Sequence, residues 1–421
     1  MKNKYSVTLF SCMLGGFIQS INACILAVLF IPLRNLYGLS YTEFGFLVGL
    51  NFIIQFIADI IFSGLIDKYG FRIFIVPAGI LSTIGLIFLA FSHIIFGSEK
   101  LFYGLILATV VFSFSGGLLE IIVSPIVSAI SHEQGGGNMS IVHSVYAFGS
   151  VAVVALTTLF LHIFGVEFWY ILVLVWAIFP FVGFLLYIKV PMPKCISEES
   201  RISGKKLMLS PYFIMCMIAI FFGAGSEIVM NQWTSAFMEN GLGLPKVYGD
   251  LIGLCGFSLF LGIGRILHGK FGEKFNLNKL LIITSFCSII CYVNVALLPS
   301  VFSVIFCVFC GIAVSILWPG TLVVASNKFP QAGALLFAVL AVAGDLGGGI
   351  AEYATGAIID GVANYGLVSN MASWLGITME QASIRFGIAV SSLYPLLCCI
   401  VHCLLFKMHK KESLLNGNSI S

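Results

Sequence analysis

Twelve apolar runs in the sequence are each long enough to cross a lipid bilayer as an α-helix, which takes about 20 residues. Hydrophobic residues make up 59% of the 421 positions and charged residues only 9%, so a soluble fold could not bury the apolar surface. The runs also lack the alternation of β-barrel strands. We therefore predict an all-α membrane protein with twelve transmembrane helices, near residues 7–31, 41–65, 71–93, 101–130, 139–164, 167–189, 211–238, 247–269, 277–299, 301–326, 331–360 and 384–407.

Lysine and arginine are distributed unequally between the two sides that this helix count defines. Seventeen of the 21 fall on the side of the two termini, Arg265 among them, whereas Arg34, Lys100, Lys246 and Arg385 fall on the other side. Because cytoplasmic loops collect positive charge, we expect both termini in the cytoplasm and the protein in the inner (cytoplasmic) membrane. The orientation of the helices in the membrane accounts for where the basic residues lie, and no nucleic-acid partner is predicted.

A polar, charged segment separates the first six runs from the last six. It begins after Lys189 with Val190-Pro-Met-Pro193 and reaches Ser210. We interpret it as a cytoplasmic linker between two six-helix bundles. The predicted domains are an N-terminal bundle (1–189), the linker (190–210), a C-terminal bundle (211–407) and a cytoplasmic tail (408–421).

The two halves carry similar motifs in the same order. Phe44-Gly-Phe-Leu-Val-Gly-Leu50 opens the second run, and Tyr248-Gly-Asp-Leu-Ile-Gly-Leu254 opens the eighth, 204 residues later. Asp67-Lys-Tyr-Gly70 and Gly269-Lys-Phe-Gly272 close the same two runs at a spacing of 202. A glycine followed by a proline-centred stretch recurs in the fourth and tenth runs. Parallel six-helix repeats characterise one large class of transporters, so the two bundles are predicted to be pseudo-symmetric.

The segment Gly64-Leu-Ile-Asp67-Lys68-Tyr-Gly70-Phe-Arg72 resembles the signature loop of the major facilitator superfamily. It occupies the same place as in that family, between the second and third helices, and the resemblance extends over essentially the whole chain. It implies the major facilitator fold and secondary transport by alternating access. It also implies a gating role for five residues of the loop: Gly64, Asp67, Lys68, Gly70 and Arg72.

Glu120 lies in the middle of the fourth run, where a carboxyl group costs about 2.5–3.5 kcal/mol on insertion scales and is usually paired, cavity-facing or functional. Burial disfavours the charged form, so this group can plausibly exchange a proton near neutral pH. Gly117-Leu-Leu-Glu120-Ile-Ile-Val-Ser124-Pro125 is similar to the fourth-helix motif of the fucose-permease-like sugar–proton symporters. The resemblance implies that Glu120 is the proton-coupling site. A protonated, hydrogen-bonded structural glutamate is the alternative.

Three features depart from those symporters. The first run has no carboxylate, Ser124 stands where the family has asparagine, and His143 and Tyr146 stand where its fifth helix has amides. The departures leave the proton site supported but not the identity of a sugar. His143 adds a second group that can titrate, with a hydrogen-bonded structural histidine as the alternative.

Further polar side chains fall in the paired first, fourth, seventh and tenth runs, where a solute site is expected. Glu227 is predicted to be a second protonatable group. Amides can bind a polyhydroxylated solute or can join helices, and an indole can stack on a sugar ring or simply pack. The predicted solute-binding residues are Gln19, Asn22, Ser124, His143, Tyr146, Asn231, Gln232 and Trp318.

Other buried polar residues receive more open interpretations. Asn51, Gln55 and Asp59 are spaced by four and form one stripe, which favours a structural or gating role over lining a cavity. Asp345 and Glu352 stand seven apart among glycines that indicate either close helix contact or a flexible segment. Outside these, Trp169 and Tyr170 at the start of the sixth run are expected to anchor the membrane interface.

Proton-coupled symport of a sugar or other small polar solute is the function that these features favour. A proton antiporter exporting a drug or metabolite is the alternative, although the fifth run from Val145 to Leu161 lacks the proline of many drug antiporters. A receptor or enzyme is disfavoured, because we find no soluble domain and no nucleophile–base arrangement. No cofactor or metal site is predicted. The expected partners are protons, the solute and lipid, and a monomer is expected.

Overall fold

A computed structural model describes residues 5–39, 41–134, 138–194, 202–245, 248–298, 300–362 and 366–415 of the chain. These described residues are mostly helical and include no β-strand. Apart from its first N–H and last C=O groups, a helix satisfies its backbone hydrogen bonds within its own segment, as a membrane interior requires.

Six long helices make up the N-terminal half. A single turn of 3-10 helix, η1 (Val166–Phe168), precedes the sixth. The six helices are α1 (Ser6–Tyr37), α2 (Tyr41–Tyr69), α3 (Phe71–Phe96), α4 (Leu101–Gln134), α5 (Asn138–Phe164) and α6 (Trp169–Lys189).

Six further crossings make up the C-terminal half, and two of them are broken. The tenth crossing consists of α12 (Ser300–Val314) and α13 (Leu317–Lys328), and the twelfth of α16 (Met379–Ser391) and α17 (Leu393–Leu415). The other elements are α7 (Gly204–Met208), α8 (Pro211–Ala236), η3 (Phe237–Gly241), η4 (Gly249–Leu254), α10 (Cys255–Phe271), η5 (Gly272–Lys274), α11 (Leu277–Leu297), α14 (Ala334–Gly361) and α15 (Gly366–Leu375).

The predicted number of crossings is confirmed. Within the described residues, eleven helical spans are long and apolar enough to cross a membrane, and α2 supplies a shorter apolar stretch over Gly49–Phe62. Two features of the helices were not predicted. Helix α17 continues through part of the predicted tail to Leu415, and α15 lies between the last two crossings, where no element was predicted. Residues 195–201 of the predicted linker and 416–421 of the predicted tail lie outside the described residues.

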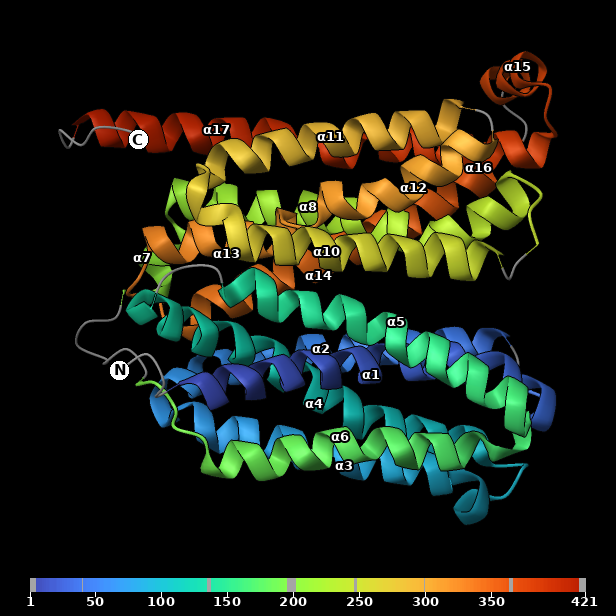
Figure 1. The fold of residues 1–421 in the computed structure, drawn as a ribbon, viewed down its shortest axis with the longest axis horizontal. Helices are drawn as coiled ribbons and strands as arrows, with labels where there is room; N and C mark the ends of the chain where they lie inside the picture. The colour runs from blue at the N-terminus through green and yellow to red at the C-terminus, as the bar shows by residue number, and fades with distance from the viewer. Residues whose placement is uncertain are drawn as a thin grey trace. The chain divides into compact units, whose positions relative to one another are not determined.

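The chain folds into two compact units. One comprises Met1–Ile202 with Pro330–Ala341, and the other comprises Ser203–Phe329 with Val342–Ser421. Within each unit the long helices run side by side (Figure 1). In the first unit α3 packs on both α4 and α6, while α1 packs on α5 and α2 on α4.

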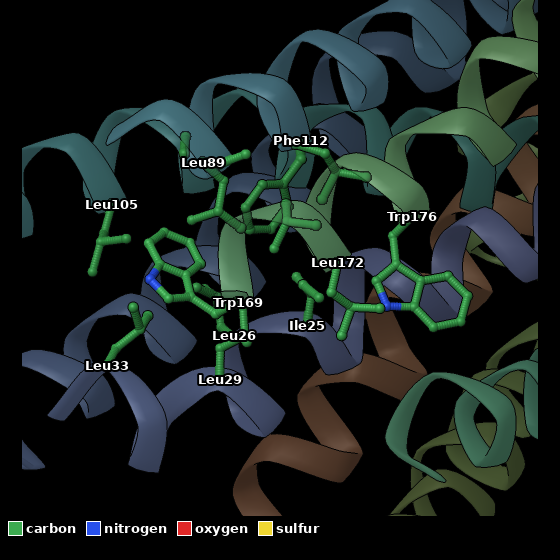
Figure 2. Packing of buried hydrophobic residues seen from close by; sticks show 14 of the residues in the cluster. Ile25, Leu26, Leu29, Leu33, Leu89, Leu105, Phe112, Trp169, Leu172 and Trp176 are labelled. Carbon is green, nitrogen blue, oxygen red and sulfur yellow. The ribbon is translucent and has the colours of Figure 1, made fainter. Parts of the chain in front are cut away.

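The core of the first unit is an apolar cluster contributed chiefly by α1, α3, α4 and α6. Ile25, Leu89, Phe112 and Trp176 are among its buried members (Figure 2). Trp169 belongs to the same cluster, is fully buried, and donates from Nε1 to the Tyr37 hydroxyl at 3.3 Å. The interface-anchor prediction for Trp169 was therefore wrong, because its indole already has a hydrogen-bond partner inside the protein.

Candidate functional site

Helices α2 and α4 approach each other closely at a pair of glycines. A Cβ atom built on Gly117 would lie 2.8 Å from the Gln55 carbonyl oxygen and 2.9 Å from the Ala58 Cβ. On Gly116 it would lie 3.1 Å from the Gln55 side chain. Only glycine permits this approach, since no real Cβ contact is that short. The contact fixes how the next turns of the two helices face each other.

The approach brings two carboxyl groups together. Carboxylate oxygens of Asp59 on α2 and Glu120 on α4 lie within 4.8 Å of one another. Asp59 is fully buried and Glu120 is partly buried. Two negative charges at this separation repel strongly in a low-dielectric interior. The arrangement therefore favours a state in which the pair holds one proton between its two members.

The rest of the α2 stripe is hydrogen-bonded within its own helix. Gln55 Nε2 donates to Asn51 Oδ1 at 2.9 Å, and Asn51 is buried. These contacts favour the structural interpretation for Asn51 and Gln55. Asp59, one turn further along, faces Glu120 instead.

Replacing Gly117 with alanine is expected to separate α2 from α4 and to lower stability by about 1–3 kcal/mol, the usual effect of overpacking. Thermal unfolding of the purified protein in detergent measures the change. Gly49→Ala on α2 is the matched control, because a Cβ there meets nothing within 4 Å. Alanine should raise stability at that position by about 0.5–1 kcal/mol. Equal effects of the two substitutions would contradict a close contact at Gly117.

The predicted solute-binding residues of the first unit lie on α1, α4 and α5. Ser124 Oγ and His143 Nε2 are 3.3 Å apart and join α4 to α5. Tyr146 is partly buried one turn further along α5, and Gln19 is partly buried on α1. Helix α1 packs along α5. The structure thus brings Ser124 and His143 into direct contact and places Gln19 and Tyr146 on the two adjoining helices.

Asn22 has a different environment. Its side chain is 2% exposed, donates to the Phe112 carbonyl at 3.3 Å and accepts from the Ser82 hydroxyl at 2.9 Å. These bonds tie α1 to α3 and α4. The amide therefore serves helix packing, the alternative that the sequence had left open, and we remove Asn22 from the solute-binding set.

In the second unit, Glu227 on α8 forms an ion pair with Arg265 on α10. Arg265 Nη2 lies 2.8 Å from Glu227 Oε1 and 2.9 Å from Oε2. The guanidinium group is buried, with the residue 3% exposed. The charge count placed Arg265 on the cytoplasmic side, which stays a prediction. It did not identify this ion pair, because counting charges cannot distinguish a loop cation from one that is paired inside the bundle.

Arg265 also satisfies a backbone carbonyl at the break in the tenth crossing. Its Nε donates to the Ser315 carbonyl oxygen at 3.0 Å. Ser315 stands between α12 and α13, four residues before Pro319. Proline has no N–H to donate to the carbonyl of the preceding turn, so this oxygen lacks its helical partner. One guanidinium group thus joins α8, α10 and the helix break.

Arg72 of the signature loop bonds to the end of α6. Its guanidinium donates to the carbonyl oxygens of Tyr187 at 3.4 Å, Val190 at 2.6 Å and Ile188. The last carbonyls of a helix lack internal partners and attract positive charge. Gly70, with φ of 89°, makes the turn before α3 that positions Arg72.

The structure says less about the other residues of the signature loop. The side chain of Lys68 is exposed, and its Nζ lies 5.4 Å from the centre of the Tyr69 ring. Gly64 and Asp67 lie within α2, but the Asp67 side chain falls outside the described residues. The gating role of this loop stays a prediction.

Arg72→Lys is expected to lower stability by about 1 kcal/mol, because lysine keeps the charge but cannot serve several carbonyls at once. Thermal unfolding in detergent measures this change. Lys68→Ala serves as the control and should alter stability by less than about 0.5 kcal/mol, as usual for exposed residues. If Arg72→Lys lowers stability no more than Lys68→Ala does, the contacts of Arg72 with the carbonyl oxygens contribute little to stability.

Arg385 caps a helix end in the second unit. It is buried on α16 and donates to the carbonyl oxygens of Ala296 at 3.1 Å and Leu298 at 2.9 Å, at the end of α11. Its guanidinium also lies 5.5 Å from the centre of the Phe237 ring. The charge count placed Arg385 on the side away from the termini, which stays a prediction; it did not identify these carbonyl partners, which hold the side chain inside the bundle.

Trp318 is held by packing against α14. A Cβ on Gly344 would lie 2.3 Å from the Trp318 ring, and one on Gly347 would lie 2.1 Å from the Phe221 carbonyl oxygen. Of the two interpretations of the glycine-rich segment, close helix contact holds at Gly344 and Gly347. The fit favours the packing interpretation for Trp318.

The remaining candidates are dispersed. Gln232 is exposed and Asn231 partly buried on α8, while Asp345 and Glu352 are partly buried on α14. Among the described residues, Asn231 Oδ1 is buried and accepts no hydrogen bond.

Comparison with known proteins places this arrangement in a family. The multi-drug resistance efflux pump PmrA of Streptococcus pneumoniae is 25% identical over 356 residues, which cover 79% of this chain and 84% of the pump. The E. coli fucose:proton symporter FucP has a TM-score of 0.74 at 14% identity over 96% of this chain and 99% of its own. The proton:xylose symporter XylE has a TM-score of 0.76 at 14% identity over 95% of each chain. At such identities the two solved structures show a common fold alone.

The family comparison covers most of the sequence. A family model described as Major Facilitator Superfamily matches residues 12–352. That span includes the signature loop, the Asp59–Glu120 pair and the Glu227–Arg265 pair. The chain is therefore a multi-pass membrane transporter that belongs to the Major Facilitator Superfamily.

Proposed function

We propose that this transporter couples solute movement to protons by alternating access, with Asp59 and Glu120 as the coupling site. The observation that carries the proposal is the approach of the two carboxyl groups to within 4.8 Å in the interior of one helix bundle. A pair that prefers to hold a single proton gains or loses charge when that proton moves. The carrier can use this change to link proton binding to solute binding.

We infer that Asp59 serves the function of the carboxylate that the first helix lacks. The sequence predicted Glu120 and Glu227 as the proton-coupling residues, with a structural or gating role for Asp59. Proximity to Glu120 supports a shared role in coupling. Conversely, Glu227 is held by both oxygens in a charge-assisted pair with Arg265. We therefore assign Glu227 to holding Arg265 and not to independent proton transfer.

Symport of a sugar or another small polar solute is the mode that we favour. Gln19, Ser124, His143 and Tyr146 supply hydrogen-bonding groups on α1, α4 and α5, which suit a hydroxylated solute. The fold is similar to those of FucP and XylE, which are described as symporters of protons with fucose and xylose. The fourth-helix motif around Glu120 supports the same mode.

Antiport of a drug or metabolite against protons is the second candidate. The 25% identity to the efflux pump PmrA favours it, whereas the absence of a proline in α5 disfavours it. The same carboxyl pair would serve either mode. In both cases we place the protein in the cytoplasmic membrane as a monomer, with both termini in the cytoplasm.

Transport in reconstituted vesicles separates the two modes. Purified protein in proteoliposomes is given candidate solutes while lumenal pH and solute uptake are followed together. Symport moves protons and solute in the same direction, and antiport moves them in opposite directions. Gradient-independent equilibration of solute, with no accompanying proton flux, would refute proton coupling in either form.

A further inference from the structure

Helix α15 (Gly366–Leu375) is a short amphipathic helix between the last two crossings, and the turn that follows it is well defined. Gly376, with φ of 64°, ends it, and the Ile377 N–H donates to the Ala372 carbonyl at 3.0 Å. This is the hydrogen bond of a Schellman helix end. Helix α16 then starts with a capping box between Thr378 and Gln381. The connection fixes the direction of α15 relative to α16.

The side chains of α15 divide into two arcs around the helix. At about 100° per residue, the apolar residues occupy one continuous arc, and its three polar residues occupy the other. The polar residues Ser369, Asn370 and Ser373 are all exposed. The apolar arc consists of Trp374, Leu367, Met371, Leu375, Val368 and Ala372, in order around the helix.

Only part of the apolar arc is covered by the protein. Val368 and Ala372 are buried against Ala382 of α16. At the other edge of the arc, Leu367 is 69% exposed and Trp374 is 70% exposed. Exposing both side chains to water would forgo the stabilisation of about 1.5–3 kcal/mol that burying a large apolar side chain brings.

We propose that Leu367, Met371 and Trp374 lie in lipid at the membrane interface, with α15 in the plane of the membrane. Figure 1 shows the ribbon of α15 nearly end-on, whereas α11 and α17 run along the page, so α15 lies across the membrane-spanning helices of its own unit. It stands at the end of that unit away from the end of α17. Tryptophan favours this level of a bilayer.

A membrane crossing of the same unit also exposes apolar side chains. Phe286, Ile290 and Leu297 form an exposed apolar row along α11. Arg385 ties the end of α11 to α16, on which α15 packs. Both α11 and α15 therefore pack on α16, and both expose apolar side chains.

The chemistry of α15 points to lipid and not to a protein partner. A stable protein interface needs about 800 Å² from each partner, whereas the uncovered edge consists of three side chains on a ten-residue helix. The helix has no charged residue. It is tethered on both sides by membrane crossings, so it needs no electrostatic attraction to stay at the interface, unlike a free amphipathic helix.

Fluorescence of Trp374 tests this placement. The wild-type protein and Trp374→Phe are reconstituted in phosphatidylcholine vesicles that carry bromine either near the headgroup end or near the terminal end of the acyl chain. The difference between the two proteins isolates the emission of Trp374. We expect this emission to be quenched more by bromine near the headgroup than by bromine near the chain end, and little by aqueous iodide. Added anionic phosphatidylglycerol or salt should not change the result, because the helix is uncharged.

Moving the indole by one residue provides the matched control. Ser373→Trp in the Trp374→Phe background places it on the polar arc, where iodide should quench it and bromine should not. An indole at 374 that iodide quenches and bromine does not would put the helix in water. One shielded from both would put it against protein, and either result would overturn the proposal. If the control variant does not fold, the comparison of wild type with Trp374→Phe still decides.

Discussion

Glu120→Gln is expected to abolish proton-driven accumulation of solute while leaving exchange of solute across the membrane intact. Glutamine keeps the size and hydrogen bonding of a protonated glutamate but cannot release the proton. The carrier can therefore still alternate with solute bound, and it loses the link to the gradient. Removal of a positioned proton-transfer group usually lowers a rate by about 10²-fold or more. Uptake under an imposed pH gradient, compared with counterflow at equal pH, measures the two activities separately.

Asp59→Asn should produce the same separation of accumulation from exchange, because the two carboxyl groups act as one site. For the same reason the double variant should be no worse than either single variant. Glu99→Gln, in the exposed turn between α3 and α4, is the control and should transport normally. Unimpaired accumulation by Glu120→Gln would remove Glu120 from the coupling site. If Asp59→Asn accumulates solute normally and Glu120→Gln does not, the coupling site is Glu120 alone.

The helical framework could be predicted from the sequence because it depends on local properties. The length of an apolar run can be read directly from the sequence. In lipid an isolated run must satisfy its own backbone hydrogen bonds, and an α-helix does this. The repeat of motifs at a nearly constant spacing identified the two halves. The break after Ser315 was missed, although Pro319 was a local signal that the carbonyl four residues earlier would need another donor.

The partners of the buried polar groups could not be predicted in the same way. Asp59 meets Glu120, and Arg265 meets Glu227, through helices that are distant in the sequence. Such pairing depends on how each helix is rotated and how closely it packs. The hydropathy of a run does not show which side of its helix faces a neighbouring helix. A count of positive charges does not distinguish a buried arginine from one in a loop. The glycines at 116 and 117 were the available signal for the close approach beside Glu120.

Arg265→Met is expected to be the most destabilising of the substitutions considered, by about 3–5 kcal/mol, the usual result of removing one partner of a buried ion pair. It leaves the Glu227 carboxylate without its cation and the Ser315 carbonyl without a donor. Thermal unfolding in detergent and the yield of monodisperse protein measure the loss. Lys270→Met, on the exposed side of the same helix, should change stability by less than about 0.5 kcal/mol.

Adding Glu227→Gln to Arg265→Met should recover much of the lost stability, because the uncompensated charge is then gone. The recovery should be incomplete, since the Ser315 carbonyl still lacks the donor that Pro319 cannot supply. A double-mutant cycle isolates the pair energy from this remaining loss. If both single substitutions are as mild as Lys270→Met, the pair does not hold the three elements together. If the double variant is no better than Arg265→Met, the carbonyl contact and not the ion pair is what stabilises the break between α12 and α13.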